Sequence, residues 1–340
     1  MSAVFLGLIL GAVFGAAARA GRFCLLRGMK GVMGGGDLSA LRAFALALAV
    51  AIPGTQILNL AGLTDLSASL PLRGQFPVLG LALGGAIFGL GMVMANACGA
   101  RSLVLFAGGN LRSLLVLLCL GLAAQASLTG VLLPLRQALQ LGVITPQWLT
   151  LTDAFASVLP RGAALAIAAG VPALALSAFA WPLIRRAPVE ALAATVVGLC
   201  VIAGWWIVFA TDDPFDPKLL NSLSFIAPVG EGLLWLMLAT GREAGFALAV
   251  VGGTIAGAFA VALITRSFTL ETFGSGRHSL FAAIGGIFMG FGGVLAMGCS
   301  IGQGLTGVST LSLASLVAFL GILAGLALGL VILRQPNTGR

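Results

Sequence analysis

Cysteines are the residues of this 340-residue chain whose type and placement best suit chemistry, and the chain has five. They form no CxxC pair, and four of them lie within or at the ends of apolar stretches, which argues against a disulfide framework or a zinc site. A free thiol is a weak hydrogen-bond donor, and its thiolate is a nucleophile and a soft ligand. We therefore expect free thiols that bind no metal or other cofactor.

Two of them, Cys98 and Cys299, end matching segments in the two halves of the chain. When they are aligned, GGAIFGLGMVMANAC pairs with GGIFMGFGGVLAMGC without a gap, and four glycines, a valine and an alanine coincide besides the cysteine. Two unrelated glycine-rich packing helices are the alternative, because small residues let membrane helices approach closely. The number of coincidences favours an internal repeat, and paired glycine-interrupted apolar segments point to the central site of a transporter.

Each repeated cysteine is followed by a change from apolar residues to small and polar ones. At lipid depth the backbone can leave a helix only where it is buried in protein or lines a water-filled cavity. Cys98 and Cys299 are therefore expected where a membrane helix breaks inside the protein. The N–H groups that begin the next half-helix can hold an anion without a full charge. The candidate pathway residues beside the two cysteines are Arg101, Ser300, Gly302 and Gln303.

A third cysteine, Cys24, lies in RAGRFCLLRGMKG among Arg19, Arg22, Arg27 and Lys30. Neighbouring cations favour the thiolate form of a cysteine. A chance cysteine in a basic loop explains this segment equally well, so both interpretations of Cys24 stay open on the segment alone.

The remaining cysteines, Cys119 and Cys200, lie within apolar stretches, and we expect them to pack as small apolar side chains. An acidic cluster at 212–216 is expected to be a solvated turn, since a metal site usually has further oxygen ligands. The nearby Trp205 and Trp206 fit an aromatic belt at the membrane interface.

The composition excludes a soluble globule. Charged residues make up 8% of the chain, where a soluble domain has about 25%, and the mean hydropathy is +1.12. Apolar runs of about 20 residues indicate helices instead of the shorter alternating strands of a membrane barrel. The net charge of +8 comes from cations scattered among the loops, which is unlike a nucleic-acid-binding patch. We expect an all-α polytopic protein of the lipid bilayer with a retained first span.

Ten apolar segments are candidates for membrane spans. They lie near residues 3–18, 38–62, 76–97, 111–133, 162–183, 190–210, 222–240, 245–265, 279–298 and 311–333. The segment 222–240 is the weakest, because it contains Pro228 and Glu231. Cytoplasmic loops are enriched in Lys and Arg, and nine crossings with the N-terminus outside place most of the 18 cations inside, whereas ten divide them almost evenly. The cations left outside by nine crossings are Arg73, Arg136, Arg161, Lys218 and Arg242.

Nine transmembrane helices divide into two halves around one linking span. In a single transmembrane transport domain over 1–340, repeat 1 is expected at about 1–135, the linking span at about 160–185 and repeat 2 at about 190–335. Because a single span links the two halves, the second half is inverted relative to the first. This arrangement brings broken helices from both halves to the membrane midplane. We therefore expect two pseudo-symmetric, inverted halves with short broken or re-entrant helices, and a C-terminus inside.

Four segments carry a resemblance that covers nearly the whole chain. They are GRFC at 21–24, ANACGARS at 95–102, SLSFIAPVGEGLLWLM at 222–237 and MGFGGVLAMGCSIGQGLTGVSTL at 289–311. They resemble the YeeE/YedE family of bacterial inner-membrane proteins, the sulphur transport family. GCSIGQG is highly specific, whereas GRFC alone is weak. The short FTLETFGSGRH approach to the last repeat departs from the family pattern.

This resemblance implies thiosulfate uptake, without enzyme activity, through a narrow centre in the bacterial inner membrane. It also implies that three pore cysteines, corresponding here to Cys24, Cys98 and Cys299, pass the ion along by S–H···S hydrogen bonds. Small sulfur-carrier proteins of the TusA type are frequent partners in the family, and some members are linked to selenium metabolism. Weak, repeated donors suit passage, because they replace the hydration of a divalent anion without trapping it.

Three alternatives stay open. The same donors would serve another sulfur or selenium species. A membrane sulfurtransferase would take up a sulfane sulfur on one cysteine as a persulfide. A soft-metal channel would use Met92, Met94 and Met297 beside the cysteines. The chain has no GxxxxGK[ST] motif for ATP, so we expect its energy to come from a gradient, a partner or consumption of the product.

Overall fold

The computed structural model describes residues 2–72, 76–140, 142–144, 147–212, 220–241, 243–272 and 275–333. Within them the regular structure is helical apart from two short strands, β1 (Phe76–Pro77) and β2 (Val143–Ile144), which pair antiparallel. Most of the predicted acidic cluster lies outside the described residues. So do five of the cations used to predict the topology, which are Arg73, Lys218, Arg242, Arg334 and Arg340.

The helices of the described residues fall into long and short ones. The long helices are α1 (Ala3–Ala20), α3 (Ser39–Leu60), α4 (Val78–Ala95), α6 (Leu111–Leu128), α9 (Arg161–Arg186), α10 (Pro188–Ala210), α12 (Phe246–Ile264), α13 (Gly276–Leu295) and α14 (Leu313–Ile332). The short ones are α2 (Leu25–Met33), α5 (Gly99–Ala107), α7 (Leu133–Leu139), α8 (Leu151–Ala156), α11 (Ile226–Met237), the 3₁₀ turns Leu66–Ala68 and Leu70–Leu72, and the π-helical turn Gly302–Gly307.

Nine helical segments of the described chain are long and apolar enough to cross a membrane, as the sequence predicts. The tenth candidate, 222–240, forms only α11. Its 12 residues extend about 18 Å, which is short of a hydrocarbon core of about 30 Å. Two of the nine segments are interrupted, because Ala3–Met33 contains α1 and α2, and Val78–Ala107 contains α4 and α5.

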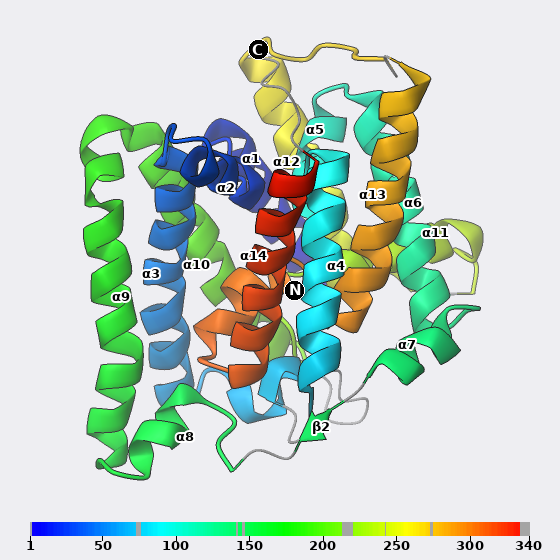
Figure 1. The fold of residues 1–340 in the computed structure, drawn as a ribbon. Coiled ribbons are helices and arrows are strands. Elements are labelled where there is room, and N and C mark those ends of the chain that lie inside the picture. The colour runs from blue at the N-terminus through cyan, green and yellow to red at the C-terminus, as the bar shows by residue number, and fades with distance from the viewer. Residues whose placement is uncertain are drawn as a thin grey trace.

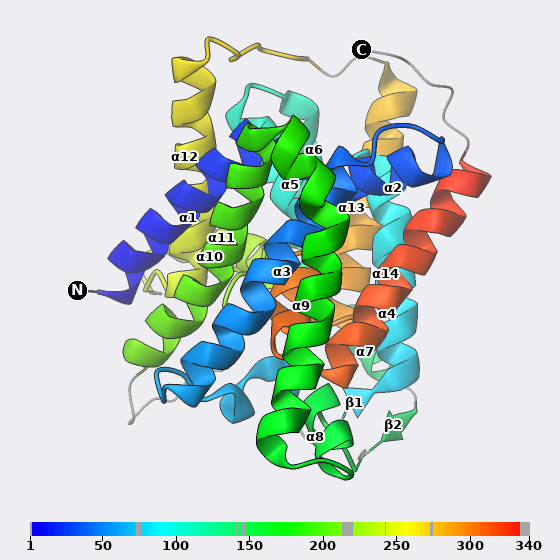
Figure 2. The same cartoon turned by 90° about the vertical axis from the view of Figure 1, so that its left-hand side faces the viewer.

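Most of the long helices run up or down a shared axis (Figures 1 and 2), and α9 lies at the edge, against α3 and α8. Three of them, α9, α12 and α14, end at the same end of the bundle, where α3 and α13 begin. The terminal turns there carry Arg42, Arg185 and Arg277, and we call this the basic end. The opposite end holds α7, α8 and the β1–β2 ladder. Three of the cations predicted to share one membrane side therefore lie at one end of the bundle.

Glycines of the repeated segments form the contact between α4 and α13. A Cβ built on Gly91 would lie 2.7 Å from the carbonyl oxygen of Gly285, and one built on Gly285 would lie 2.7 Å from that of Gly91. Gly84 and Gly292 approach one another in the same way. Residue numbers fall along one helix as they rise along the other, so the two helices are antiparallel. Their backbones approach closely because no side chain stands between them.

Further glycines of each segment face a second neighbour. Gly85 lies against the backbone of Ile322 on α14, and its counterpart Gly286 lies against that of Leu120 on α6. The next glycines, Gly89 and Gly290, make the same kind of contact one turn further along α14 and α6, respectively. Each repeated helix therefore packs on the long helix that follows the break in the other one.

Trp205 contradicts the expectation of an interfacial belt. It is fully buried in α10, and its Nε1 donates to Ser309 Oγ at 3.4 Å. Trp206 is 43% exposed and keeps an outward position. Successive residues of a helix point about 100° apart, so one of two adjacent tryptophans faces the core while the other faces outward.

Candidate functional site

The chain breaks in the same way before Cys98 and before Cys299. The helices α4 and α13 end just ahead of these cysteines, and the turns that follow hold Asn96 and Met297 with φ of 59°. This left-handed conformation is uncommon for residues other than glycine. Both breaks lie where the change to small and polar residues predicts them.

The two thiols accept hydrogen bonds from the backbone that follows each break. Cys98 Sγ accepts from the N–H of Arg101 at 3.4 Å, and Cys299 Sγ accepts from the N–H of Gly302 at 3.3 Å. Each donor lies three residues after its cysteine, as in a helix N-cap. The N–H groups expected to hold an anion therefore hold thiols in this conformation. A sulfur that accepts through a lone pair keeps its S–H free to donate elsewhere.

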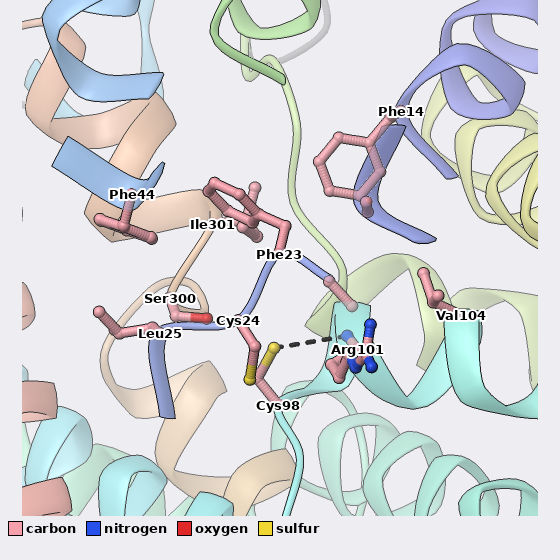
Figure 3. Close-up of a pocket in the computed structure, with 12 residues that line it drawn as sticks. Phe14, Phe23, Cys24, Leu25, Phe44, Cys98, Arg101, Val104, Ser300 and Ile301 are labelled. Carbon is pink, nitrogen blue, oxygen red and sulfur yellow. Dashed lines mark hydrogen bonds between the residues drawn. The ribbon is translucent and has the colours of Figure 1, made fainter. Parts of the chain in front are cut away.

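A small cavity at the centre brings Cys24 and Cys98 together, and their sulfurs lie side by side (Figure 3). The cavity has a volume of about 10 Å³, which is room for roughly one water molecule. Cys24 directly precedes α2, but its side chain makes no cap bond there, unlike that of Cys98. The remaining lining residues are Phe14, Ala18, Phe23, Leu25, Phe44, Ala100, Arg101, Val104, Ser300 and Ile301.

Cys299 does not line this cavity, although its neighbour Ser300 does. It is 1% exposed, and the backbone amides of Phe225 and Ile301 interact with its sulfur. Cys98 contacts the Ser300 hydroxyl and lies close enough to Cys24 and Cys299 to interact electrostatically with both. The three cysteines therefore form one cluster, in which Cys98 is near both of the others.

The other predicted residues of the second repeat, Gly302 and Gln303, are buried and lie outside the cavity lining. Gln303 Nε2 donates to the carbonyl oxygen of Ala296 at 2.8 Å, which joins the π-helical turn to the end of α13. Its Oε1 is buried without a hydrogen-bond partner among the described residues. In this conformation Gln303 positions the break.

Replacing Gln303 with leucine is expected to destabilise the break. The Ala296 carbonyl loses its side-chain donor in a buried site, at a cost of about 1–3 kcal/mol. Thermal unfolding of the purified protein measures this, and we expect a midpoint several degrees lower, with reduced uptake. An unchanged midpoint would show that water or backbone replaces the amide.

The aromatic wall of the cavity was missed by sequence reasoning. Phe23 had a signal, because it belongs to the GRFC segment. Phe14 and Phe44 had none, because they are ordinary apolar residues of α1 and α3 whose role depends on how the helices pack. The rings of Phe23 and Phe44 stack with centroids 5.7 Å apart.

A second, wider cavity of about 550 Å³ opens at the opposite end, near α8 and the start of α9. Its lining includes Gln56, Thr310 and one residue of each charge, Asp153 and Arg161. Gln56 Nε2 donates to the Ser309 carbonyl oxygen at 2.9 Å, so the cavity reaches the chain that follows the π-helical turn. Within the described chain, none of its lining residues also lines the cysteine cavity, so the two cavities are separate in this conformation.

Membrane-length helices, interrupted near buried thiols at the centre, define the class as a multi-pass membrane transport protein. The chain belongs to the sulphur transport family, which it matches over residues 20–328.

Two relatives extend this likeness over most of the chain. It is 27% identical over 320 residues to the thiosulfate transporter TsuA of Escherichia coli strain K12, covering 89% of this chain and 87% of that protein. It is also 27% identical over 348 residues to the thiosulfate transporter TsuA of Spirochaeta thermophila, covering 95% of this chain and 96% of that protein. The family resemblance of the four segments is confirmed.

Proposed function

We propose that this protein carries thiosulfate across the bacterial inner membrane into the cytoplasm, past Cys24, Cys98 and Cys299. The observation that carries the proposal is the cluster of three buried thiols at the places where helices are interrupted. Two relatives that align with most of this chain are named thiosulfate transporters, and this supports thiosulfate as the substrate.

The chemistry of the cluster suits a divalent anion in transit. Leaving water is costly for a charged group, so the path must offer donors. The thiols of Cys98 and Cys299 accept from backbone N–H groups and keep their own S–H groups to donate. Such donors are weak, which favours release over storage. Because the cavity holds about one water molecule, the centre must widen when the ion passes.

We further propose that the domain over 1–340 consists of two inverted halves, with the basic end in the cytoplasm. Matching glycines meet matching neighbours in both halves, and α4 runs antiparallel to its counterpart α13. Reciprocal contacts of this kind are those expected across a two-fold axis. The cations gathered at one end support the orientation. A reporter fused to the C-terminus and found on the outer face would overturn it.

The experiment that tests the function is uptake of thiosulfate labelled on its outer sulfur. Bacteria lacking other thiosulfate importers, with and without this protein, are compared with unlabelled thiosulfate, sulfite or selenite as competitors. We expect uptake that depends on the protein and is reduced most by thiosulfate. If the protein gives no uptake, or if a selenium compound competes better, the substrate is a different sulfur or selenium species.

A small sulfur carrier of the TusA type remains a proposed partner at the basic end. Co-purification of such a carrier with the protein tests this, and its absence from stringently washed membranes would count against it.

A further inference from the structure

A third cavity adjoins the cysteine cluster at the basic end. It has a volume of about 440 Å³, and Arg101 and Val104 line both it and the cysteine cavity. Its charged residues are Arg19, Arg22, Arg101 and Glu271, which come from α1, the turn before Cys24, α5 and the connection from α12 to α13. We call this cavity the arginine vestibule.

The vestibule holds three guanidinium groups and one carboxylate. Arg19 is fixed, because it donates to Ser267 Oγ at 2.8 Å and to the Val104 carbonyl oxygen at 3.3 Å. Glu271 accepts from the side-chain amide of Asn110. Within the described residues neither Arg22 nor Arg101 forms an ion pair with a carboxylate. The vestibule therefore carries an excess of positive charge, whereas the cavity at the opposite end is lined by one residue of each sign.

We propose that the arginine vestibule is a second binding site, for a divalent oxyanion such as sulfate or thiosulfate, distinct from the cysteine cluster. A guanidinium presents two parallel N–H donors to an oxyanion, which a thiol cannot do. Arg22 has φ of 47°, a left-handed conformation that is rare for a bulky residue. Observed backbone strain of this kind clusters at functional sites.

The position of the vestibule along a path rests on the proposed transport. An ion that has passed Cys98 meets Arg101 next and arrives among the arginines at the basic end. Glu271 opposes the arginines there and weakens the hold on an anion. The vestibule therefore binds the ion transiently before it is released.

The test is a calorimetric titration with sulfate of the full chain in nanodiscs of phosphatidylcholine, at one fixed ionic strength. We expect Arg22→Gln to weaken sulfate binding roughly tenfold, the loss of about one charge-assisted hydrogen bond. Glu271→Gln is expected to tighten binding several-fold, because it removes a like charge from the site. Arg186→Gln removes one cation from the same end of the bundle outside the vestibule and is expected to leave binding unchanged.

Any of three results would contradict the proposed binding site. The first is that the wild type binds no sulfate, the second is that Arg22→Gln and Arg186→Gln lose sulfate affinity equally, and the third is that Glu271→Gln binds sulfate more weakly than the wild type. A Cys98→Ala protein separates this site from the cysteines, since it should bind sulfate as the wild type does. If the protein shows this pattern of sulfate binding but takes up no thiosulfate, the proposed transport is wrong and the proposed binding site in the vestibule is retained.

Discussion

Replacing Cys98 or Cys299 with alanine is expected to abolish thiosulfate uptake while the protein still inserts into the membrane. Each change removes an S–H donor from a buried path, and a hydrogen bond to a charged group contributes about 1.5–3 kcal/mol. That free energy corresponds to a roughly 10- to 150-fold loss of rate per cysteine, which brings uptake down to or near the background of cells without the protein. The measurement is uptake of outer-sulfur-labelled thiosulfate at matched membrane expression. Cys24→Ala should also impair uptake, because Cys24 lines the same cavity as Cys98.

Two cysteines outside the cluster serve as matched controls for these variants. Cys119 and Cys200 are free cysteines of α6 and α10 that line none of the cavities described above. Alanine at either position should leave uptake near the wild-type rate. Wild-type rates in both Cys98→Ala and Cys299→Ala would refute the thiol relay and make these cysteines packing residues. A persulfide found on one cysteine by mass spectrometry after exposure to thiosulfate would favour a sulfurtransferase instead.

Replacing Gly91 with leucine is expected to prevent α4 and α13 from packing. Even the Cβ would lie 2.7 Å from the carbonyl oxygen of Gly285 and 2.8 Å from the amide nitrogen of Met289. These are backbone atoms, so they cannot rotate away as a side chain can. Overpacking in a core typically costs about 1–3 kcal/mol, and a whole leucine against backbone should exceed that range. We expect loss of monodisperse protein in size-exclusion chromatography after extraction.

Gly170 on α9 and Gly252 on α12 are matched controls, since a Cβ at either would meet nothing within 4 Å. Leucine at these positions should leave the elution profile and the thermal midpoint unchanged. A Gly91→Leu protein that elutes and unfolds like the wild type would show that the α4–α13 contact is dispensable.

The spans and the two repeated breaks were predictable because both depend on local properties of the sequence. Apolar length marked the helices that can cross a membrane, and the distribution of cations, together with Pro228 and Glu231, excluded 222–240, which forms only the short helix α11. The change in composition after Cys98 and Cys299 marked the breaks. The short helix α2 was not predicted, because its glycines and cations are those of a basic loop.

Most of the cavity wall was beyond sequence reasoning. The residues that enclose Cys24 and Cys98 come from helices far apart in the chain, and no local pattern distinguishes Phe14 from other apolar residues of α1. The aromatic contacts Phe14–Phe225 and Phe44–Phe319 also join distant segments. Such contacts follow from how the helices pack, and a pattern read along one helix does not contain them.

The small volume between Cys24 and Cys98 has a consequence for the energy balance of the cell. A bacterial interior is electrically negative, and the potential acts on each charge with about 2.3 kcal/mol per 100 mV. A divalent anion is therefore driven outward by twice that amount. A centre that stayed wide enough for such an ion would drain the cytoplasmic pool and dissipate the potential. The cavity has room for about one water molecule, so the centre is closed to such an ion in this conformation, and under the proposed transport it must open again for each ion that passes.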